Sequence, residues 1–330
     1  MTLQPSTGAP HARISGLGSA LPSRVVDNAE MCTYIDSSDE WIQQRTGIVE
    51  RRWVAEGETV ESLSLAAGRA ALDHAGLTGA DLDAVIVSTV SHMLQTPSLA
   101  AVIAAKIGTD GAAAFDIAAA CAGFCYGLAQ AESLVRSGAA THVLVIGAET
   151  LSNLTDLSDR STAFLFSDGA GAAVVGPSDE PAMGPVVWGS DGGQADAITM
   201  SNPWPEALAL GETSSIVMDG RAVFRWATGF IATAAERCLS AAGVRPDELD
   251  LFVPHQANNR ITDAMLRHLH LPESVTVART ITHYGNNSAA SIPVALCDML
   301  ASGEAKSGDL ALLIGFGAGL VYAGQVVRLP

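Results

Sequence analysis

An internal repeat constrains the fold more than any other feature of this sequence. ALDHAGLTGADLDAVIVS (Ala71–Ser88) lines up with CLSAAGVRPDELDLFVPH (Cys238–His255) at a constant offset. In each copy a helical pattern ends at Ala-Gly before Leu-Asp opens an apolar strand. Further along, ACAGFCYGLAQAESLVRSG is answered by NSAASIPVALCDMLASGEAKSG, and each string precedes a strand that ends in Ile-Gly. A long period that occurs twice predicts two similar halves rather than a solenoid. We place them at residues 1–180 and 181–330, because GPSDEPAMGP interrupts the pattern there.

Short apolar runs bounded by Gly, Ser or Pro predict buried parallel strands, and stretches rich in Ala and Leu predict the helices between them. The strands are expected at Asp83–Ser88, His142–Gly147, Ala172–Gly176, Leu249–Pro254 and Leu310–Gly315. The helices are expected at Val60–His74, Cys121–Ser137, Phe224–Ala242 and Ile292–Ala301. This alternation predicts an α/β fold with parallel sheets.

The repeat also predicts where the chemistry lies. It aligns Ser88 with His255, each at the end of a strand, and Cys121 with Ser288, each at the start of a helix. Reactive side chains should therefore gather where strand ends and helix N-termini of the two halves face one another.

Composition and charge exclude several classes of function. The formal net charge is −17, so a nucleic-acid partner is not expected. No uninterrupted apolar stretch is long enough to span a membrane, and the first residues lack the pattern of a signal peptide. The five cysteines are an odd number at irregular spacing, which argues against a disulfide framework, and no second Cys/His pair completes a metal site. We expect a cytoplasmic protein without a metal.

Cys121 is the candidate nucleophile. It stands in FDIAAACAGFCYGLAQAESLV, where an apolar run passes through small residues into an amphipathic helix. A thiol at a helix N-terminus lies at the positive end of the helix dipole, so we expect its pKa to lie below the free value of about 8.5. The thiolate is the form that attacks acyl groups.

Three further segments carry polar or flexible groups at the ends of predicted elements. His255 follows a buried strand in DLFVPHQANNR, and Asn286 follows Gly285 in THYGNNSAAS. Helix capping alone would explain the asparagine, whereas an amide aimed at a pocket is the functional alternative. The Gly-rich turn in IGFGAGLVYAG (Ile314–Gly324) can offer backbone N–H groups to an oxyanion.

With these residues identified, the chain resembles β-ketoacyl-acyl carrier protein (ACP) synthase III over nearly its whole length. The matching strings are SSDEWIQQRTGI, FDIAAACAGF, FSDGAGAAVV, VPHQANNR, YGNNSAAS and GFGAGLVYAG. The resemblance implies a thiolase-like fold of five layers, αβαβα, and a homodimer. It also implies a ping-pong reaction with acyl-CoA and malonyl-ACP as substrates and no further cofactor.

The resemblance assigns roles by position. Cys121 would carry the acyl group, and His255 and Asn286 would donate hydrogen bonds to the malonyl thioester as carbon dioxide leaves. The N–H groups of Cys121 and Ala318 would form the oxyanion hole. The remaining residues are those for CoA (Trp41, Arg45, Arg160, Asn258), the acyl pocket (Thr96, Phe316) and the docking of the acidic carrier protein (Arg260, Arg225, Arg267).

Three positions depart from the family pattern. Thr96 stands where acetyl-specific members carry a phenylalanine that closes the partner's acyl pocket, which predicts a primer larger than acetyl for fatty acid or polyketide synthesis. Arg221 replaces the asparagine that is usual near pantetheine. Ala318 interrupts a run of three glycines but keeps its N–H.

Other readings of the same residues remain. Some relatives transfer an acyl group to an alcohol or amine without decarboxylation, and Asn286 beside His255 argues against that chemistry because no enolate then needs to be held. A 3-hydroxy-3-methylglutaryl-CoA synthase would need a carboxylate base whose motifs are not seen. An inert chain-length subunit would have lost Cys121, His255 or Asn286.

Overall fold

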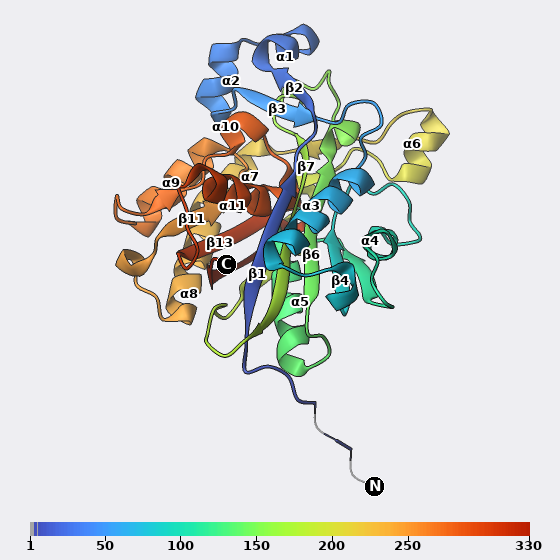
Figure 1. Ribbon diagram of the computed structural model, residues 1–330. Coiled ribbons are helices and arrows are strands. Elements are labelled where there is room, and N and C mark those ends of the chain that lie inside the picture. Colours follow the sequence, from blue (N-terminus) through green and yellow to red (C-terminus); the bar gives the residue numbers. More distant parts are fainter. Residues whose placement is uncertain (1–2, 5) are drawn as a thin grey trace.

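The computed structural model describes residues 3–4 and 6–330 and contains two five-stranded sheets. Figure 1 shows both sheets and the helices that cover them. The first sheet has the order β1-β7-β6-β4-β5, with strands β1 His11–Ala20, β4 Ala84–Ser88, β5 Ala113–Ile117, β6 Val143–Thr150 and β7 Asp168–Ser178. The second has the order β12-β11-β13-β14-β8, with strands β8 Val187–Ser190, β11 Leu251–Pro254, β12 Thr276–Val277, β13 Leu310–Gly317 and β14 Val321–Arg328.

Helices cover both faces of each sheet, which gives the five layers αβαβα implied by the resemblance. Apolar side chains of α3 and α4 pack on one face of the first sheet. The helices α5 and α11 lie between the two sheets, and α8 and α9 cover the outer face of the second. Their bounds are α3 Val60–Ala75, α4 Leu99–Ile107, α5 Gly123–Ser137, α8 Ala232–Ala242, α9 Asn259–Leu269 and α11 Ser291–Ser302.

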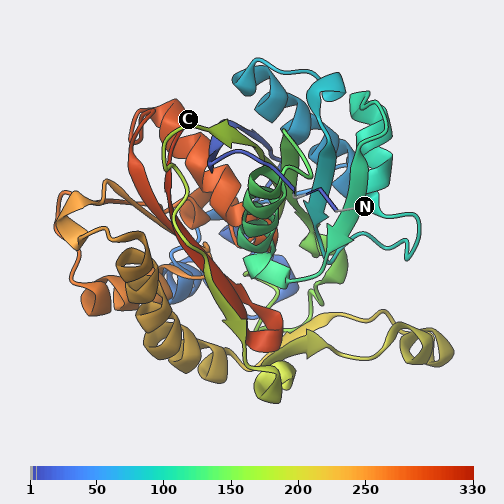
Figure 2. The same ribbon diagram turned by 90° about the horizontal axis from the view of Figure 1, so that it is seen from below.

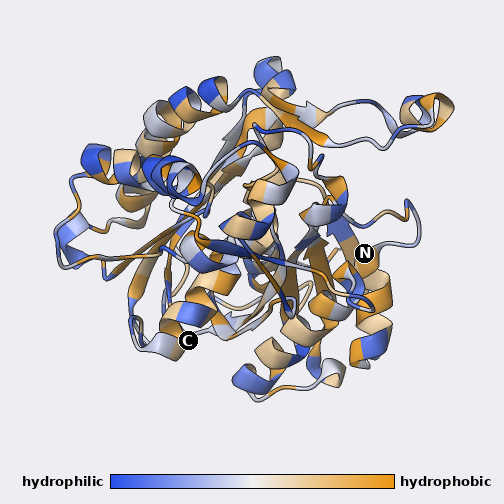
Figure 3. Ribbon diagram, turned by 90° about the horizontal axis from the view of Figure 1, so that it is seen from above, coloured by the Kyte–Doolittle hydropathy of each residue, from blue (hydrophilic) through white to orange (hydrophobic). Residues whose placement is uncertain are grey.

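The outer helices are amphipathic because only one side of each meets a sheet. The buried positions of α3 include Val60, Leu63, Ala67 and Ala71, which recur every three or four residues. Figure 3 shows this as alternating hydrophilic and hydrophobic segments along the outer helices. By contrast, α5 and α11 are buried over more of their surface, since they touch both sheets.

The sheets are mixed rather than purely parallel. Strand β4 runs parallel to β5 and β6, but β7 is antiparallel to both β1 and β6. The prediction of a parallel strand at Ala172–Gly176 is therefore wrong. Its apolar run reflects burial on both faces, which the covering helices impose on a strand of either direction. In the second half, β13 is parallel to β11 and antiparallel to β14.

The two halves repeat the same elements, although the register differs at one turn. The strands β6 and β13 begin at residues 143 and 310, the offset seen in the sequence. Short 3-10 turns precede α5 and α11 at Ala120–Ala122 and Ser288–Ala290, and the first residue of each has a positive φ, 43° and 50°. The backbone thus pairs Ala120 with Ser288, so the alignment of Cys121 with Ser288 is wrong by one residue. Runs of small residues conceal this difference in the sequence.

The predicted helix starts and breaks also differ in detail. The helix expected from Cys121 begins at Gly123, after the 3-10 turn. The helix expected at Phe224–Ala242 consists of α7 (Gly220–Trp226), a π-helical segment (Ala227–Ile231) and α8. The other 3-10 segments are Gly79–Asp81, Leu151–Leu154, Gly192–Ala197, Pro246–Glu248 and Ala318–Leu320.

Two smaller additions stand on this frame. One contains α1 (Asn28–Tyr34), α2 (Asp39–Thr46), the hairpin of β2 (Arg24–Asp27) and β3 (Glu50–Trp53), and α10 (Ile281–Tyr284). The other is the hairpin of β9 (Ile198–Met200) and β10 (Ile216–Met218), which carries α6 (Trp204–Leu210) away from the body of the molecule (Figure 2). The exposed side chains of Leu208 and Leu210 make the end of this hairpin hydrophobic.

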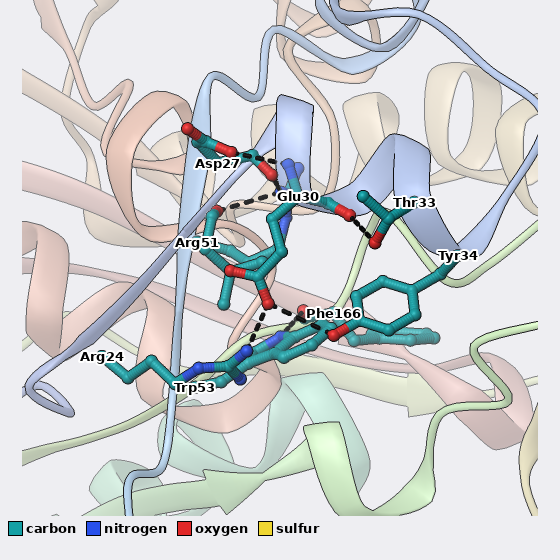
Figure 4. A network of polar contacts seen from close by, with 9 residues as sticks. Arg24, Asp27, Glu30, Thr33, Tyr34, Arg51, Trp53 and Phe166 are labelled. Atoms are coloured by element: carbon teal, nitrogen blue, oxygen red, sulfur yellow. Dashed lines mark hydrogen bonds and ion pairs between the residues drawn. The ribbon is translucent and has the colours of Figure 1, made fainter.

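A buried arginine fixes the first addition (Figure 4). The Arg51 guanidinium is fully buried and donates to the carbonyl oxygens of Val26 and Asp27 and to Oδ1 of Asn28. Burial lowers its pKa to about 10. The Asn28 amide in turn donates to Asp39 at the start of α2, at 2.8 Å. This chain of contacts holds α2 in place, and α2 carries two of the predicted CoA-binding residues.

Two expectations from composition can be compared with the structure. Within the described part of the chain, no helix combines the length and apolar character that a membrane crossing requires. The five cysteines all lie in that part, and each is a free thiol.

Candidate active site

A cavity of about 730 Å³ lies where the two halves meet. Cys121, His255 and Asn286 all line it, together with Ser288 and the turn after β13. The expectation that strand ends and helix N-termini would bring these side chains together is confirmed. Of the other predicted residues, the lining includes Trp41, Arg45, Asn258, Phe316, Ala318, Arg225 and Arg260. Arg160, Thr96 and Arg267 are not in the lining.

A tight turn places Cys121 at the cavity. Ala120, immediately before it, has a φ of 43°, a conformation that costs a non-glycine residue energy and occurs often at functional sites. On the facing side, a Cβ atom at Gly317 would lie 3.0 Å from Cys121 Sγ and 2.8 Å from its Cβ. Glycine is therefore required at residue 317 for the second half to approach the thiol this closely.

The prediction of a lowered thiol pKa is wrong. Burial, a hydrogen bond with Ser288 that opposes it, and the negative charge of nearby Glu149 together set the pKa of Cys121 at about 12, above the usual value. Desolvation therefore outweighs the helix N-terminus that sequence reasoning relied on. The resting thiol is protonated at neutral pH and needs a base when it reacts.

His255 follows directly after β11, and its backbone N–H donates to the carbonyl oxygen of Ile314 at 2.8 Å. The imidazole Nδ1 lies 2.7 Å from Ser291 Oγ, and the ring packs edge-on against Phe316 at a centroid distance of 5.4 Å. Burial lowers the pKa of His255 to about 3, so the imidazole is neutral at physiological pH.

The hydrogen bonds around Ser291 favour one tautomer of His255. The backbone N–H of Gln256 donates to Ser291 Oγ at 3.4 Å, and the serine hydroxyl is then well placed to donate its own proton to Nδ1. A neutral imidazole that accepts at Nδ1 carries its proton on Nε2. In this tautomer Nε2 of His255 is a hydrogen-bond donor to the cavity.

Asn286 is oriented in a similar way. Its backbone N–H donates to the carbonyl oxygen of Leu165, and its own carbonyl oxygen accepts from Ser167. The N–H of Ser288 donates to the side-chain Oδ1 at 3.0 Å, which identifies the other amide atom, Nδ2, as the donor free for a ligand. The side chain orders the turn to Ser288 and lines the cavity, but it is the N-cap of neither the 3-10 turn at Ser288–Ala290 nor α11, so helix capping does not explain this asparagine.

The predicted CoA residues form one platform. The Arg45 and Arg160 guanidinium groups lie over the Trp41 ring, at 5.5 Å and 5.1 Å from its centroid. Asn258 caps α9 with Oδ1 and donates from Nδ2 to the carbonyl oxygen of Arg45. Indole and guanidinium faces suit the stacking of a base, and arginines suit phosphate. Asn258 therefore stabilises the start of α9 and its contact with α2, in addition to any contact with a ligand.

The three predicted docking arginines differ in their surroundings. Arg260 lies in the first turn of α9 with its guanidinium over Phe224, at 5.5 Å. A cation there faces the positive end of the helix dipole, so helix stability does not explain it. Arg267 lies in the last turn of α9, where a cation stabilises the helix. Arg225 and the unusual Arg221 belong to α7 and line the cavity.

Thr96 lies in the loop after β4, before Pro97, and is exposed. It is absent from the cavity of its own chain, and its expected contact with a partner's pocket stays a prediction. Phe316 is buried beside His255 and lines the cavity. Its predicted contact with the acyl chain is likewise untested.

Sequence reasoning missed several residues of the site. The hairpin of β9 and β10 contributes Ile198, Met200, Ile216 and Met218 to the lining. Their alternate spacing in two short strands was a signal for a half-buried hairpin. The contacts of Ser291 and Glu149 had no such signal, because their partners are distant in the sequence.

Comparison with known proteins shows the family to which a chain with this cavity and these residues belongs. Residues 115–192 match the family described as 3-oxoacyl-[acyl-carrier-protein (ACP)] synthase III, and residues 239–329 match its C-terminal part. The chain is 56% identical to β-ketoacyl-[acyl-carrier-protein] synthase III of Streptomyces glaucescens over 330 residues, 99% of each chain. It belongs to this family. It is thus a thiolase-fold acyltransferase, as the resemblance implied.

Solved structures of the family agree in fold. The priming β-ketosynthase of the R1128 polyketide biosynthetic pathway has a TM-score of 0.97 and 46% identity, with 100% of this chain and 99% of the other covered. The 3-oxoacyl-[acyl-carrier-protein] synthase III of Aquifex aeolicus has a TM-score of 0.89 and 40% identity, covering 96% and 99%.

Proposed function

We propose that this synthase condenses an acyl-CoA primer with malonyl-ACP through an acyl group on Cys121. The observation that supports it most directly is the pair of donors assigned above: Nε2 of His255 and Nδ2 of Asn286 in one cavity with the thiol. Two neutral donors suit an enolate, whose negative oxygen gains most from hydrogen bonds preformed in a dry site.

The reaction has two halves. In the first, Cys121 Sγ attacks the thioester carbon of acyl-CoA, the bond to the CoA sulfur breaks, and CoA leaves with the thiol's proton. In the second, malonyl-ACP loses carbon dioxide and its carbanion attacks the acyl carbon. The bond to Sγ then breaks, the sulfur takes up a proton from solvent, and a β-ketoacyl-ACP is released. During carbon dioxide loss, His255 and Asn286 donate to the enolate oxygen, and the N–H groups of Cys121 and Ala318 hold the oxyanion of the condensation.

The reaction can be tested with the intact mass of the protein. We would mix the purified synthase with an equimolar set of acyl-CoAs and then add malonyl-ACP. We expect an acyl adduct on Cys121 that malonyl-ACP discharges with release of carbon dioxide. An adduct that only an alcohol or amine discharges would support the acyltransferase alternative, and no adduct would mean that Cys121 is not the nucleophile.

A second copy of the chain is the proposed partner at one edge of the first sheet. Strand β5 ends that sheet, and its Phe115 is exposed. Met93 and Leu94, in the loop after β4, are also exposed, at 55% and 63%. An open strand edge beside large apolar side chains favours pairing with another strand. Sedimentation should give a dimer, and a monomer at micromolar concentration would refute the pairing.

Thr96 lies in that same loop, so a dimer would carry it to the partner's cavity. A small side chain there leaves room for a primer larger than acetyl. We expect Thr96→Phe to shift preference toward acetyl-CoA in the mass assay, while the control Gln95→Phe adds the same ring one residue away and leaves the preference unchanged. Equal preference in all three proteins would refute the role of Thr96.

Acyl carrier proteins are acidic, and the arginines at the cavity suit one despite the net charge of −17. Arg260 is the best supported, since its helix position is otherwise unfavourable. Arg260→Glu should raise the KM for malonyl-ACP and leave acylation by acyl-CoA intact. Arg267→Glu, on the same helix but outside the cavity, is the matched control with a smaller effect.

A further inference from the structure

A buried carboxyl group near the thiol has no role in the reaction described above. Glu149, on β6, is fully buried. It accepts hydrogen bonds from Ser91 Oγ at 2.6 Å, from the N–H of Val90 at 3.1 Å and from Thr89 Oγ1 at 3.3 Å. Ser288 Oγ lies 3.4 Å from its Oε1. All these partners are neutral, and no cation among residues 3–4 and 6–330 forms an ion pair with the carboxylate, which is unusual for a buried acid.

Ser288 connects this carboxyl group to the nucleophile. Its Oγ donates to Glu149 Oε1, and Ser288 lines the same cavity as Cys121. Ser288 has a φ of 50°, a backbone conformation that costs a non-glycine residue energy. Its backbone N–H donates to Asn286 Oδ1. A hydroxyl both donates and accepts, so it can receive one proton while it passes on another. Ser288 Oγ therefore connects Glu149 Oε1 to the cavity that holds the Cys121 thiol.

We propose that Glu149 accepts the proton of Cys121 through Ser288 when the thiol attacks. The thiol proton moves to Ser288 Oγ, and the serine proton moves to Glu149. Sγ then bonds to the acyl carbon, the bond to the CoA sulfur breaks, and the carboxyl group gives up the proton as CoA leaves as a thiol. In this step Ser288 would contact the reacting sulfur, and Glu149 would act through Ser288. The inference rests on the proposed function and identifies the base that function requires.

The acidities of the three groups agree with this path. Burial raises the pKa of Cys121 to about 12, so the thiol does not ionise unaided at neutral pH. Burial lowers the pKa of His255 to about 3, and its Nδ1 is engaged by Ser291, so the imidazole is a weak base. Burial raises the pKa of Glu149 to about 7, against hydrogen bonds that lower it. A carboxylate of that basicity suits general base catalysis near neutral pH.

Few charged groups near Glu149 could change the pKa of its carboxyl group. Among the described residues, the charge of Glu149 acts on the Cys121 thiol. On the neighbouring strand β7, Asp168 is held instead by Ser152 and the N–H of Val54. Cys125 on α5 is buried against Gly315 of β13. The charged groups of α3, which packs on the same sheet, are exposed or partly exposed: Glu61, Arg69, Asp73 and His74.

Two roles for Glu149 predict effects of opposite sign, which makes the test decisive. As a nearby negative charge it raises the thiol pKa, so neutralising it by Glu149→Gln would make Cys121 react faster. As a proton acceptor it assists the thiol, so the same substitution would make Cys121 react more slowly.

We would measure the rate at which iodoacetamide alkylates Cys121, by intact mass, between about pH 5 and about pH 9. In the unchanged protein the rate should rise through about pH 7 and level off as Glu149 ionises. Glu149→Gln and Ser288→Ala should each lose this rise and react on the order of 10²-fold more slowly at the plateau. Glu149→Asp, which keeps the carboxyl group, should recover part of the rate.

Ser91→Ala is the matched control, because it removes a hydrogen bond to Glu149 without cutting the path to Cys121. It should move the rise to higher pH and keep the plateau. Ser288→Ala carries the same test if Glu149→Gln fails to fold. Alkylation needs neither acyl-CoA nor ACP, so it is independent of the condensation assay. Equal or faster alkylation of Glu149→Gln, or of Ser288→Ala where that variant carries the test, would overturn the proposal.

Discussion

Replacing Ser291 by alanine removes the hydrogen bond that keeps the proton of His255 on Nε2. The bond is short, 2.7 Å, and both residues are buried, so water does not replace it. Leaving a buried polar atom such as Nδ1 without a partner costs about 1–3 kcal/mol. If that energy is lost when His255 must donate to the enolate, decarboxylation slows roughly 5- to 150-fold. The upper end approaches the roughly 10²–10³-fold loss expected for removing the donor itself.

The effect should be confined to one half of the reaction. Acylation of Cys121, followed by intact mass, does not use the Nε2 donor and should keep its rate in Ser291→Ala. Release of carbon dioxide from malonyl-ACP should fall by the factor above, and Ser291→Cys, which retains a weak donor, should fall less. Equal loss in both halves would indicate a general disturbance of the site. No loss in decarboxylation would refute the assignment of the tautomer.

Three further substitutions test the packing and the charges of the site. Gly285→Ala should destabilise the fold by about 2–6 kcal/mol in urea unfolding. Gly285 has a φ of 61°, and a Cβ atom there would lie 2.9 Å from the Cβ of Arg51. An unchanged unfolding midpoint would contradict this expectation. Gly317→Ala should slow acylation on the order of 10²-fold by displacing the Cys121 thiol, and normal acylation would show that the close approach is not needed. The pKa of Glu149 is raised to about 7 on folding, so its stabilising contribution is present below about pH 4.5 and is lost as pH rises through about 7. Glu149→Gln should remove roughly 3 kcal/mol of that pH dependence in unfolding measurements, and an identical slope in both proteins would refute the raised pKa.

The resemblance implied the five layers, whereas the residue patterns themselves predicted the two halves and the meeting of Cys121, His255 and Asn286. These follow from local patterns and from the repeat, which records how strand ends and helix starts recur in both halves. The direction of β7 could not be predicted in the same way, since burial on both faces gives the same apolar run in either direction.

The electrostatics of the site depended on contacts that no local pattern records. Ser291 lies 36 residues from His255, and Ser288 lies 139 residues from Glu149. A helix N-terminus predicted an acidic thiol at Cys121, but the degree of burial is a property of the assembled fold, and burial raises the pKa. The positions of the reactive groups were predictable, whereas their protonation states were not.

The central claim is that Cys121 carries the acyl group while His255 and Asn286 hold the enolate. The most direct test measures the two half-reactions separately in His255→Ala and Asn286→Ala: acylation by intact mass, and carbon dioxide release from malonyl-ACP. We expect acylation to persist in both variants and decarboxylation to fall roughly 10²–10³-fold. Decarboxylation at an unchanged rate in either variant, or loss of acylation alone, would contradict the account.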